Sequence, residues 1–103
     1  MEVYSVRMTK AAYEDLRTIV NHFEYKLKNP QAALSVSEML ISSAEALSMF
    51  PKRHRVRKKD VHGRSIRFSV AGSYVLVYWV DDNAMAVEIL RIIHSRRDIN
   101  RLL

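Results

Sequence analysis

The chain has 103 residues, 49% hydrophobic and 27% charged, a composition that suits one folded domain with one core and excludes a disordered tail. Its 17 Lys and Arg outnumber 11 Asp and Glu, and the net charge of +6 favours an acidic or polyanionic partner. The absence of Cys excludes disulfides and thiolate metal sites. No apolar run approaches the roughly 20 residues that span a bilayer, and the N-terminus lacks a signal-peptide segment, so we expect a cytoplasmic protein.

The first half of the chain predicts a strand followed by a helical hairpin. Residues 3–8 are rich in β-favouring types, and Thr9 suits the N-cap of a helix that continues to about Leu27. Asn29, with a proline after it, suits the N-cap of a second helix, which Pro51 prevents from continuing. So short a connection between two long helices predicts an antiparallel pair. The apolar stripes expected to face the core are Ala12, Leu16, Ile19, Val20, Phe23 and Leu27 in the first helix, and Ala33, Val36, Leu40, Ala44 and Leu47 in the second.

The second half changes to patterns typical of strands. Residues 65–70 alternate strictly between polar and apolar, and residues 74–80 are almost wholly apolar, which predicts a central strand covered on both faces. Residues 84–93 predict a further strand, and residues 96–103 a short terminal helix. The order β-α-α-β-β-β indicates a single α+β domain over residues 1–103, an antiparallel-dominated sheet with a helical hairpin packed on one face.

The excess positive charge is concentrated in one segment. Residues 52–67, expected in a loop and the strand after it, hold eight bases and one acid, which gives this segment +7 and leaves −1 for the rest of the chain. A second group of arginines, at 91–101, lies near the C-terminus. We interpret these bases as a surface for a phosphate backbone or an acidic peptide, and the alternative is a solvated loop that aids solubility. The candidate binding residues are Lys52, Arg53, Arg55, Arg57, Lys58, Lys59, Arg97 and Arg101.

His94 is the candidate acid–base residue. It ends an apolar strand, and imidazole titrates near neutral pH. Metal-free RNA cleavage needs a base, an acid and cations for the developing charge. His94 with Arg64, Arg67 and Arg96 forms the catalytic set if the protein is a nuclease. The alternative is a hydrogen-bonded histidine at the end of a strand.

Other kinds of site are less favoured. The sequence has no glycine-rich phosphate loop and no carboxylate cluster with metal-ligand spacing. His54 and His62 lie in the basic segment, where a cation would be repelled, so we expect no metal and no cofactor. Tyr74, Tyr78 and Trp79 are candidate platforms for stacking bases, although aromatic residues in a central strand more often belong to the core.

Five phrases, in this order along the chain, resemble the RelE/ParE toxin superfamily. Residues 8–16 carry the Ala-x-x-Asp-Leu start of its first helix, and residues 29–33 and 47–51 resemble the beginning and the proline stop of its second helix. Residues 74–78 and 89–98 resemble its closing strands. The last phrase, Ile-x-x-His-x-Arg-Arg-Asp, is commonest among the ParE-like members, and the resemblance covers nearly the whole chain.

The resemblance implies the toxin of a type II toxin–antitoxin system, associated with growth inhibition and plasmid stabilisation. It also implies a cognate antitoxin that wraps the toxin across the sheet and the helical hairpin. The charge of +7 in residues 52–67 predicts that this partner is acidic, and the apolar surface left exposed in the unbound chain predicts a homodimer that partly covers it. The apolar contacts to that partner are expected from Leu16, Ile19 and Phe23 or from the C-terminal Ile99, Leu102 and Leu103, whichever of them the fold leaves exposed.

Two activities occur on this fold, and the sequence favours one of them. RelE-like members are ribosome-dependent mRNA endonucleases, with an Arg where this chain has Val75 and a catalytic Tyr near the C-terminus, whereas no Tyr follows Tyr78 here. Arg67 and Arg96 match at most half of such a site. We therefore favour the ParE-like activity, inhibition of DNA gyrase without a nuclease site. The alternatives are a metal-independent RelE-like nuclease that acts on ribosome-bound mRNA, and a non-toxic basic module that binds nucleic acid.

Overall fold

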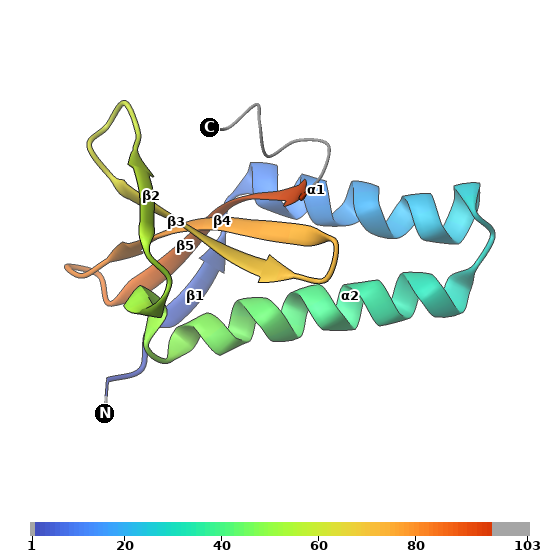
Figure 1. Ribbon diagram of the computed structural model, residues 1–103. Helices are drawn as coiled ribbons and strands as arrows, with labels where there is room; N and C mark the ends of the chain where they lie inside the picture. The colour runs from blue at the N-terminus through green and yellow to red at the C-terminus, as the bar shows by residue number, and fades with distance from the viewer. Residues whose placement is uncertain (1, 96–103) are drawn as a thin grey trace.

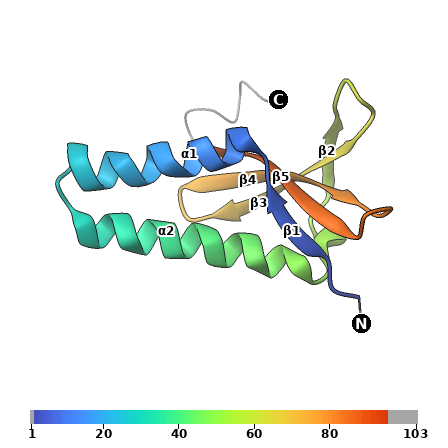
Figure 2. The ribbon, with the colours of Figure 1, turned by 180° about the vertical axis from the view of Figure 1, so that it is seen from behind.

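Two helices lie side by side on one face of a twisted sheet (Figures 1 and 2). The structure is a computed structural model that describes residues 2–95, so the terminal helix expected at 96–103 lies outside the described residues. The strands and helices of the described part are β1 (Ser5–Met8), α1 (Lys10–Asn21), the π-helical turn η1 (His22–Lys26), α2 (Pro30–Glu45), the 3-10 turns η2 (Ala46–Ser48) and η3 (Pro51–Arg53), β2 (Val56–Lys59), β3 (Ser65–Ala71), β4 (Tyr74–Asp81) and β5 (Ala86–His94).

Both helices begin at the predicted caps. Thr9 Oγ1 accepts a hydrogen bond from the Ala12 N–H at 3.1 Å, and Asn29 Oδ1 accepts one from the Ala32 N–H at 3.1 Å. These bonds satisfy backbone donors that the first turn of a helix leaves without a partner. The first helix is extended by η1 to Lys26, and η2 extends the second, so the hairpin has nearly the predicted length.

The strand order β1-β5-β4-β3-β2 confirms the predicted central strand. β1 runs parallel to β5, and the other neighbours in the sheet are antiparallel. Val75 to Tyr78 of β4 are buried on both faces, as their continuous apolar run predicts. Among the described residues the sheet has five strands rather than the four expected, because residues 56–59 form the edge strand β2 where a loop was predicted. The sequence pattern does not predict this strand because most of its residues are basic. An edge strand tolerates such charge because its outer side faces solvent.

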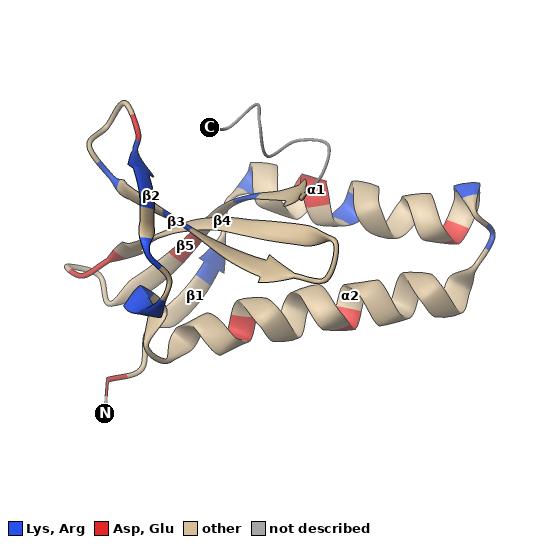
Figure 3. Cartoon of the chain, in the orientation of Figure 1, with Lys and Arg blue, Asp and Glu red and all other residues tan. Residues whose placement is uncertain are grey.

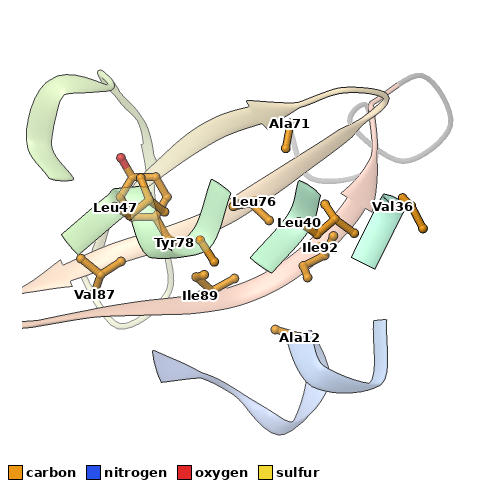
Figure 4. Close-up of a cluster of buried hydrophobic side chains, with 11 residues drawn as sticks. Ala12, Val36, Leu40, Leu47, Ala71, Leu76, Tyr78, Val87, Ile89 and Ile92 are labelled. Carbon is orange, nitrogen blue, oxygen red and sulfur yellow. The ribbon is translucent and has the colours of Figure 1, made fainter. Parts of the chain in front are cut away.

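The main core lies between the helices and the sheet (Figure 4). All five stripe residues of the second helix are buried, whereas in the first helix only Ala12 is buried, Leu27 is exposed and the rest are half-buried. A smaller cluster of Ile66, Phe68, Val75, Val77 and Ile93 covers the opposite face of the sheet. Residues 2–95 contain no helix with the length and apolar character needed to cross a bilayer.

Candidate functional site

The basic segment, residues 52–67, forms a projection at the end of the molecule opposite the α1–α2 connection (Figure 1). It comprises part of η3, all of β2, the turn after it and the first half of β3. Figure 3 shows Lys and Arg gathered along these elements, whereas α1 carries charges of both signs and the charged residues of α2 are all acidic. The structure therefore keeps together the charge that the sequence concentrates.

Some of the bases fasten this segment to the body of the molecule. Arg53 Nη1 donates hydrogen bonds to the carbonyls of Met49 at 2.7 Å and Phe50 at 3.1 Å. Arg67 Nη1 donates to the carbonyls of Lys52 and His54. These two guanidinium groups therefore hold the chain that leads from α2 into β2, and they still contribute positive charge to the surface.

Lys52 is fixed by a polar cluster at one end of the sheet. Its Nζ lies 2.7 Å from Asp82 Oδ2, and the Tyr4 hydroxyl donates to Asp82 Oδ1 at 3.1 Å. The hydrogen bond from Lys52 lowers the pKa of Asp82, outweighing burial, which raises it. This pair is exposed, so we assign it a positioning role and little stability.

A hydrogen-bonded turn forms the tip of the projection. Asp60 Oδ1 accepts hydrogen bonds from the N–H groups of His62 at 3.0 Å and Arg64 at 2.9 Å, and Oδ2 accepts one from Arg64 Nε at 2.7 Å. Burial raises the pKa of Asp60, but the bonds from Arg64 and His62 outweigh it and lower the pKa. Gly63 adopts a φ of 78°, which glycine adopts without strain. The turn presents Val61 with 96% of its surface exposed.

Two guanidinium groups cover aromatic rings on the sheet. Arg57 lies over the Phe68 ring, 4.9 Å from its centroid, and Arg64 lies 5.4 Å from the centroid of Trp79. Trp79 Nε1 also donates to Glu88 Oε1 at 3.1 Å. Since Phe68 is buried and Trp79 is half-buried under these contacts, neither ring is an open platform for a base.

Tyr78 belongs to the core, and Tyr74 is half-buried. The Tyr78 hydroxyl donates to the Pro51 carbonyl at 2.6 Å, and burial raises its pKa to about 12. The His54 ring lies edge-on to Tyr78, and burial together with the charges of Arg53 and Arg67 lowers the pKa of His54. No group of three His, Cys, Asp or Glu in residues 2–95 is arranged to hold a metal ion.

His94 lies at the other end of the sheet from Arg64 and Arg67. It pairs with Tyr74, whereas Arg67 pairs with Tyr78, which in turn faces Ile89. The five residue-to-residue steps from Ile89 to His94 correspond to about 17 Å along β5. The structure therefore does not bring His94 together with Arg64 and Arg67, and Arg96 lies outside the described residues.

His94 lines a hollow of 440 Å³ between α1 and the ends of β4 and β5. Its ring lies edge-on to that of Tyr74, with centroids 5.6 Å apart. A second hollow of 490 Å³ lies beside the basic segment. The first is lined by Asp15, Thr18, Ile19, His22, Phe23, Ser73, Tyr74, Ile92 and His94; the second by Lys52, His62, Gly63, Arg64, Ser65, Arg67, Trp79, Val80 and Asp82.

Asp15 is a positioning residue that the sequence pattern does not mark as a functional group. Its carboxylate accepts hydrogen bonds from Arg91 Nε at 2.7 Å, from Arg91 Nη2 at 3.0 Å and from the Ile92 N–H at 3.0 Å. It thus ties α1 to the edge of β5 beyond the end of β1. The signal in the sequence was the Asp of the Ala-x-x-Asp-Leu phrase. Arg91 is turned toward α1, and Arg97 and Arg101 lie outside the described residues.

Comparisons with known proteins agree with this architecture. The model of a family described as the ParE toxin of the type II toxin–antitoxin system parDE matches residues 6–99. No curated protein matches the chain. The solved chromosomal ParDE system of P. aeruginosa is similar, with a TM-score of 0.74, 22% identity, and 91% of this chain and 98% of that chain covered.

Two RelE-type complexes are similar as well. The RelBE2 toxin–antitoxin complex of Mycobacterium tuberculosis has a TM-score of 0.64 and 26% identity, with 91% of this chain and 93% of that chain covered. The archaeal RelE–RelB complex of Pyrococcus horikoshii OT3 has a TM-score of 0.62 and 16% identity, with 92% and 98% covered. The fold is therefore shared with both branches of the superfamily.

Proposed function

We propose that this chain, which belongs to the ParE toxin family of type II toxin–antitoxin systems, inhibits DNA gyrase in the cytoplasm until a cognate antitoxin neutralises it. The match to the ParE family model over residues 6–99 supports the gyrase branch. The observation that carries the choice is the separation of His94 from Arg64 and Arg67 along the sheet. An endonuclease without a metal would need its acid–base group and its cations around one phosphodiester.

Val75 and Tyr78, the last tyrosine of the chain, support the same choice. Val75 stands where RelE-like nucleases carry an Arg, and only 1% of its surface is exposed, within the apolar cluster on the second face of the sheet. The Tyr78 hydroxyl is engaged with the Pro51 carbonyl and its pKa is raised to about 12. Neither position offers a group to a phosphodiester.

Supercoiling by purified gyrase tests the proposal directly. We expect the full chain to inhibit supercoiling of relaxed plasmid and to leave mRNA on translating ribosomes intact, and we expect His94→Ala to inhibit equally well. His22→Ala, which removes an exposed histidine that lines the same hollow, serves as the matched control and should also inhibit equally well. Cleavage of mRNA in the ribosomal A site that disappears in His94→Ala, without gyrase inhibition, would establish the RelE-like activity instead.

The antitoxin is proposed as an acidic protein with an apolar helix. The bases of the projecting segment would speed its encounter, and apolar contacts would supply the tight binding. Ile19 and Phe23 line the hollow beside His94 and are half-buried, as is Leu16. The other three residues expected to contact the antitoxin, Ile99, Leu102 and Leu103, lie outside the described residues.

The unbound chain is proposed to associate with itself. Leu34 and Ile41, seven residues apart on α2, are 60% and 41% exposed and lie on one side of the helix. Association would remove such apolar surface from water. Sedimentation velocity with and without the antitoxin measures it, and a strictly monomeric unbound chain at high concentration would contradict this part of the proposal.

A further inference from the structure

The hairpin of β2 and β3 has the form of a charged ribbon with an apolar tip. Four of the five residues from Arg55 to Lys59 are basic, and β2 is the outermost strand of the sheet. Lys58 pairs with Ile66 and Lys59 with Ser65, so these successive bases point to opposite faces of the ribbon. The ribbon therefore carries cations on both of its faces.

The tip is held in one shape by the Asp60 hydrogen bonds. A further bond from the Asp60 N–H to the Arg64 carbonyl, 3.1 Å long, closes the turn. The turn nevertheless exposes nearly the whole of Val61 to solvent. A rigid turn that displays an apolar side chain between two basic arms loses little conformational entropy when a partner buries that side chain.

We propose that this hairpin inserts into the major groove of duplex DNA, with Val61 on the groove floor and the bases Arg55, Lys58 and Lys59 on the phosphates. The major groove is about 12 Å wide and 8.5 Å deep and admits a two-stranded ribbon. Lys59 and Lys58 precede Val61 by two and three residues, a span of at most about 7 to 11 Å of chain, which is comparable with the depth of the groove and places them near the phosphate rim. Cations on both faces suit a groove that has a phosphate backbone on each side.

Other nucleic acids suit the hairpin less well. The major groove of A-form RNA is deep and too narrow for side chains to reach the bases. Proteins that bind single strands use exposed aromatic rings, whereas Arg57 covers Phe68 and Arg64 covers Trp79. This inference adds to the proposed function a contact with the DNA on which gyrase acts, and it can be tested without gyrase.

The experiment compares binding of the full chain to a 30-base-pair duplex over a range of salt concentrations, by fluorescence anisotropy. The plot of log affinity against log salt has a negative slope. The triple variant Arg55→Glu, Lys58→Glu and Lys59→Glu should reduce the magnitude of this slope by about 3, since each lost phosphate contact removes about 0.9. The variant Val61→Ser, with its charge unchanged, should bind about tenfold more weakly with the same slope, because burial of a valine is worth that factor. Circular dichroism verifies that each variant is folded.

The matched control is Lys10→Glu, Arg17→Glu and Lys26→Glu, which changes the net charge equally on exposed positions of α1 and η1. We expect it to change the slope by less than 1. An equal fall in this control, an unaffected Val61→Ser, or tighter binding to single-stranded DNA or duplex RNA would each overturn the proposal. So would a triple variant that binds the duplex normally but releases the antitoxin faster, since the hairpin would then be an antitoxin site.

Failure of this inference and failure of the proposed function give different results. Binding to the duplex by the hairpin, without inhibition of supercoiling, would support the groove contact and contradict gyrase as the target. Inhibition of supercoiling that the triple variant retains, without duplex binding, would support gyrase as the target and overturn the groove contact.

Discussion

Tyr78 shows how one polar atom in the core positions a charged surface. Its ring is fully buried, and its hydroxyl reaches the Pro51 carbonyl, 27 residues earlier, directly before the basic segment. The apolar run of β4 predicts that Tyr78 is buried. The partner of its hydroxyl cannot be predicted in this way, because it depends on where the chain after α2 crosses the sheet.

Tyr78→Phe should lower the free energy of unfolding by about 1 to 2 kcal/mol, the range for loss of a buried hydrogen bond. Denaturant unfolding monitored by circular dichroism measures this change. Tyr13→Phe is the control: Tyr13 is 58% exposed, so its removal should change stability by less than about 0.5 kcal/mol. Equal effects in both variants would show that the Pro51 bond does not stabilise the fold.

The same residue makes stability fall at high pH. Burial raises the pKa of Tyr78 from 10.0 to about 12, so between these values the unfolded chain has released the phenolic proton while the folded chain retains it. Ionisation then favours the unfolded state, and the stabilisation is complete below pH 10 and decreases toward pH 12. The difference in unfolding free energy between the wild-type chain and Tyr78→Phe should therefore shrink above pH 10. A constant difference from pH 8 to 11.5 would contradict the raised pKa.

At the scale of elements, local chemistry predicts the helices better than the edge strand. Thr9 and Asn29 predict the starts of their helices, because the side-chain oxygen of a cap binds the backbone N–H three residues later. The sequence pattern does not predict β2, because its residues, Val-Arg-Lys-Lys, have no apolar alternation. Its pairing with β3 is also irregular near Arg57. β2 is a strand because it pairs with the neighbouring β3, and this pairing cannot be read from the local sequence pattern.

Thr9→Ala should destabilise the fold more than Asn29→Ala. Asn29 only caps α2, whereas the Thr9 hydroxyl accepts from the Ala12 N–H and also donates to the Leu90 carbonyl of β5 at 2.9 Å. We expect a loss of about 2 kcal/mol for Thr9→Ala and about 1 kcal/mol for Asn29→Ala. Thermal and denaturant unfolding of both variants would measure the losses, and a larger loss for Asn29→Ala would show that the link between α1 and β5 is unimportant.

At the scale of the whole molecule, the fold separates His94 from the basic segment, although the sequence alone allows the two to lie together in one site. His94 ends β5, and the basic segment precedes β4, so a meander allows them to meet or to lie apart depending on register. The observed pairs, His94 with Tyr74 and Arg67 with Tyr78, place them at opposite ends of the sheet. Register between strands depends on long-range packing, which is why composition and motif predict the family and the charge but not this separation.

That separation predicts how charge affects recognition of the antitoxin. The basic segment carries +7 while the rest of the chain sums to −1, so an acidic partner is attracted mainly to one end of the molecule. The triple variant Arg55→Glu, Lys58→Glu and Lys59→Glu should slow association with the antitoxin by about 10- to 100-fold at low salt, because opposite potentials steer the encounter. Its dissociation rate should change little if the bound partner is held by the apolar contacts proposed near Ile19 and Phe23. Arg57 is left in place since it covers Phe68.

Surface plasmon resonance at two salt concentrations separates these rates. Charge reversal at Lys10, Arg17 and Lys26 controls for net charge alone, and it should slow association less, because those residues lie outside the basic segment. Ile19→Asp should have the opposite signature, with normal association and fast dissociation, because it places a charge in the hollow beside His94. If the triple variant associates at the wild-type rate with the wild-type salt dependence, the basic segment does not steer the antitoxin, and its charge serves another partner.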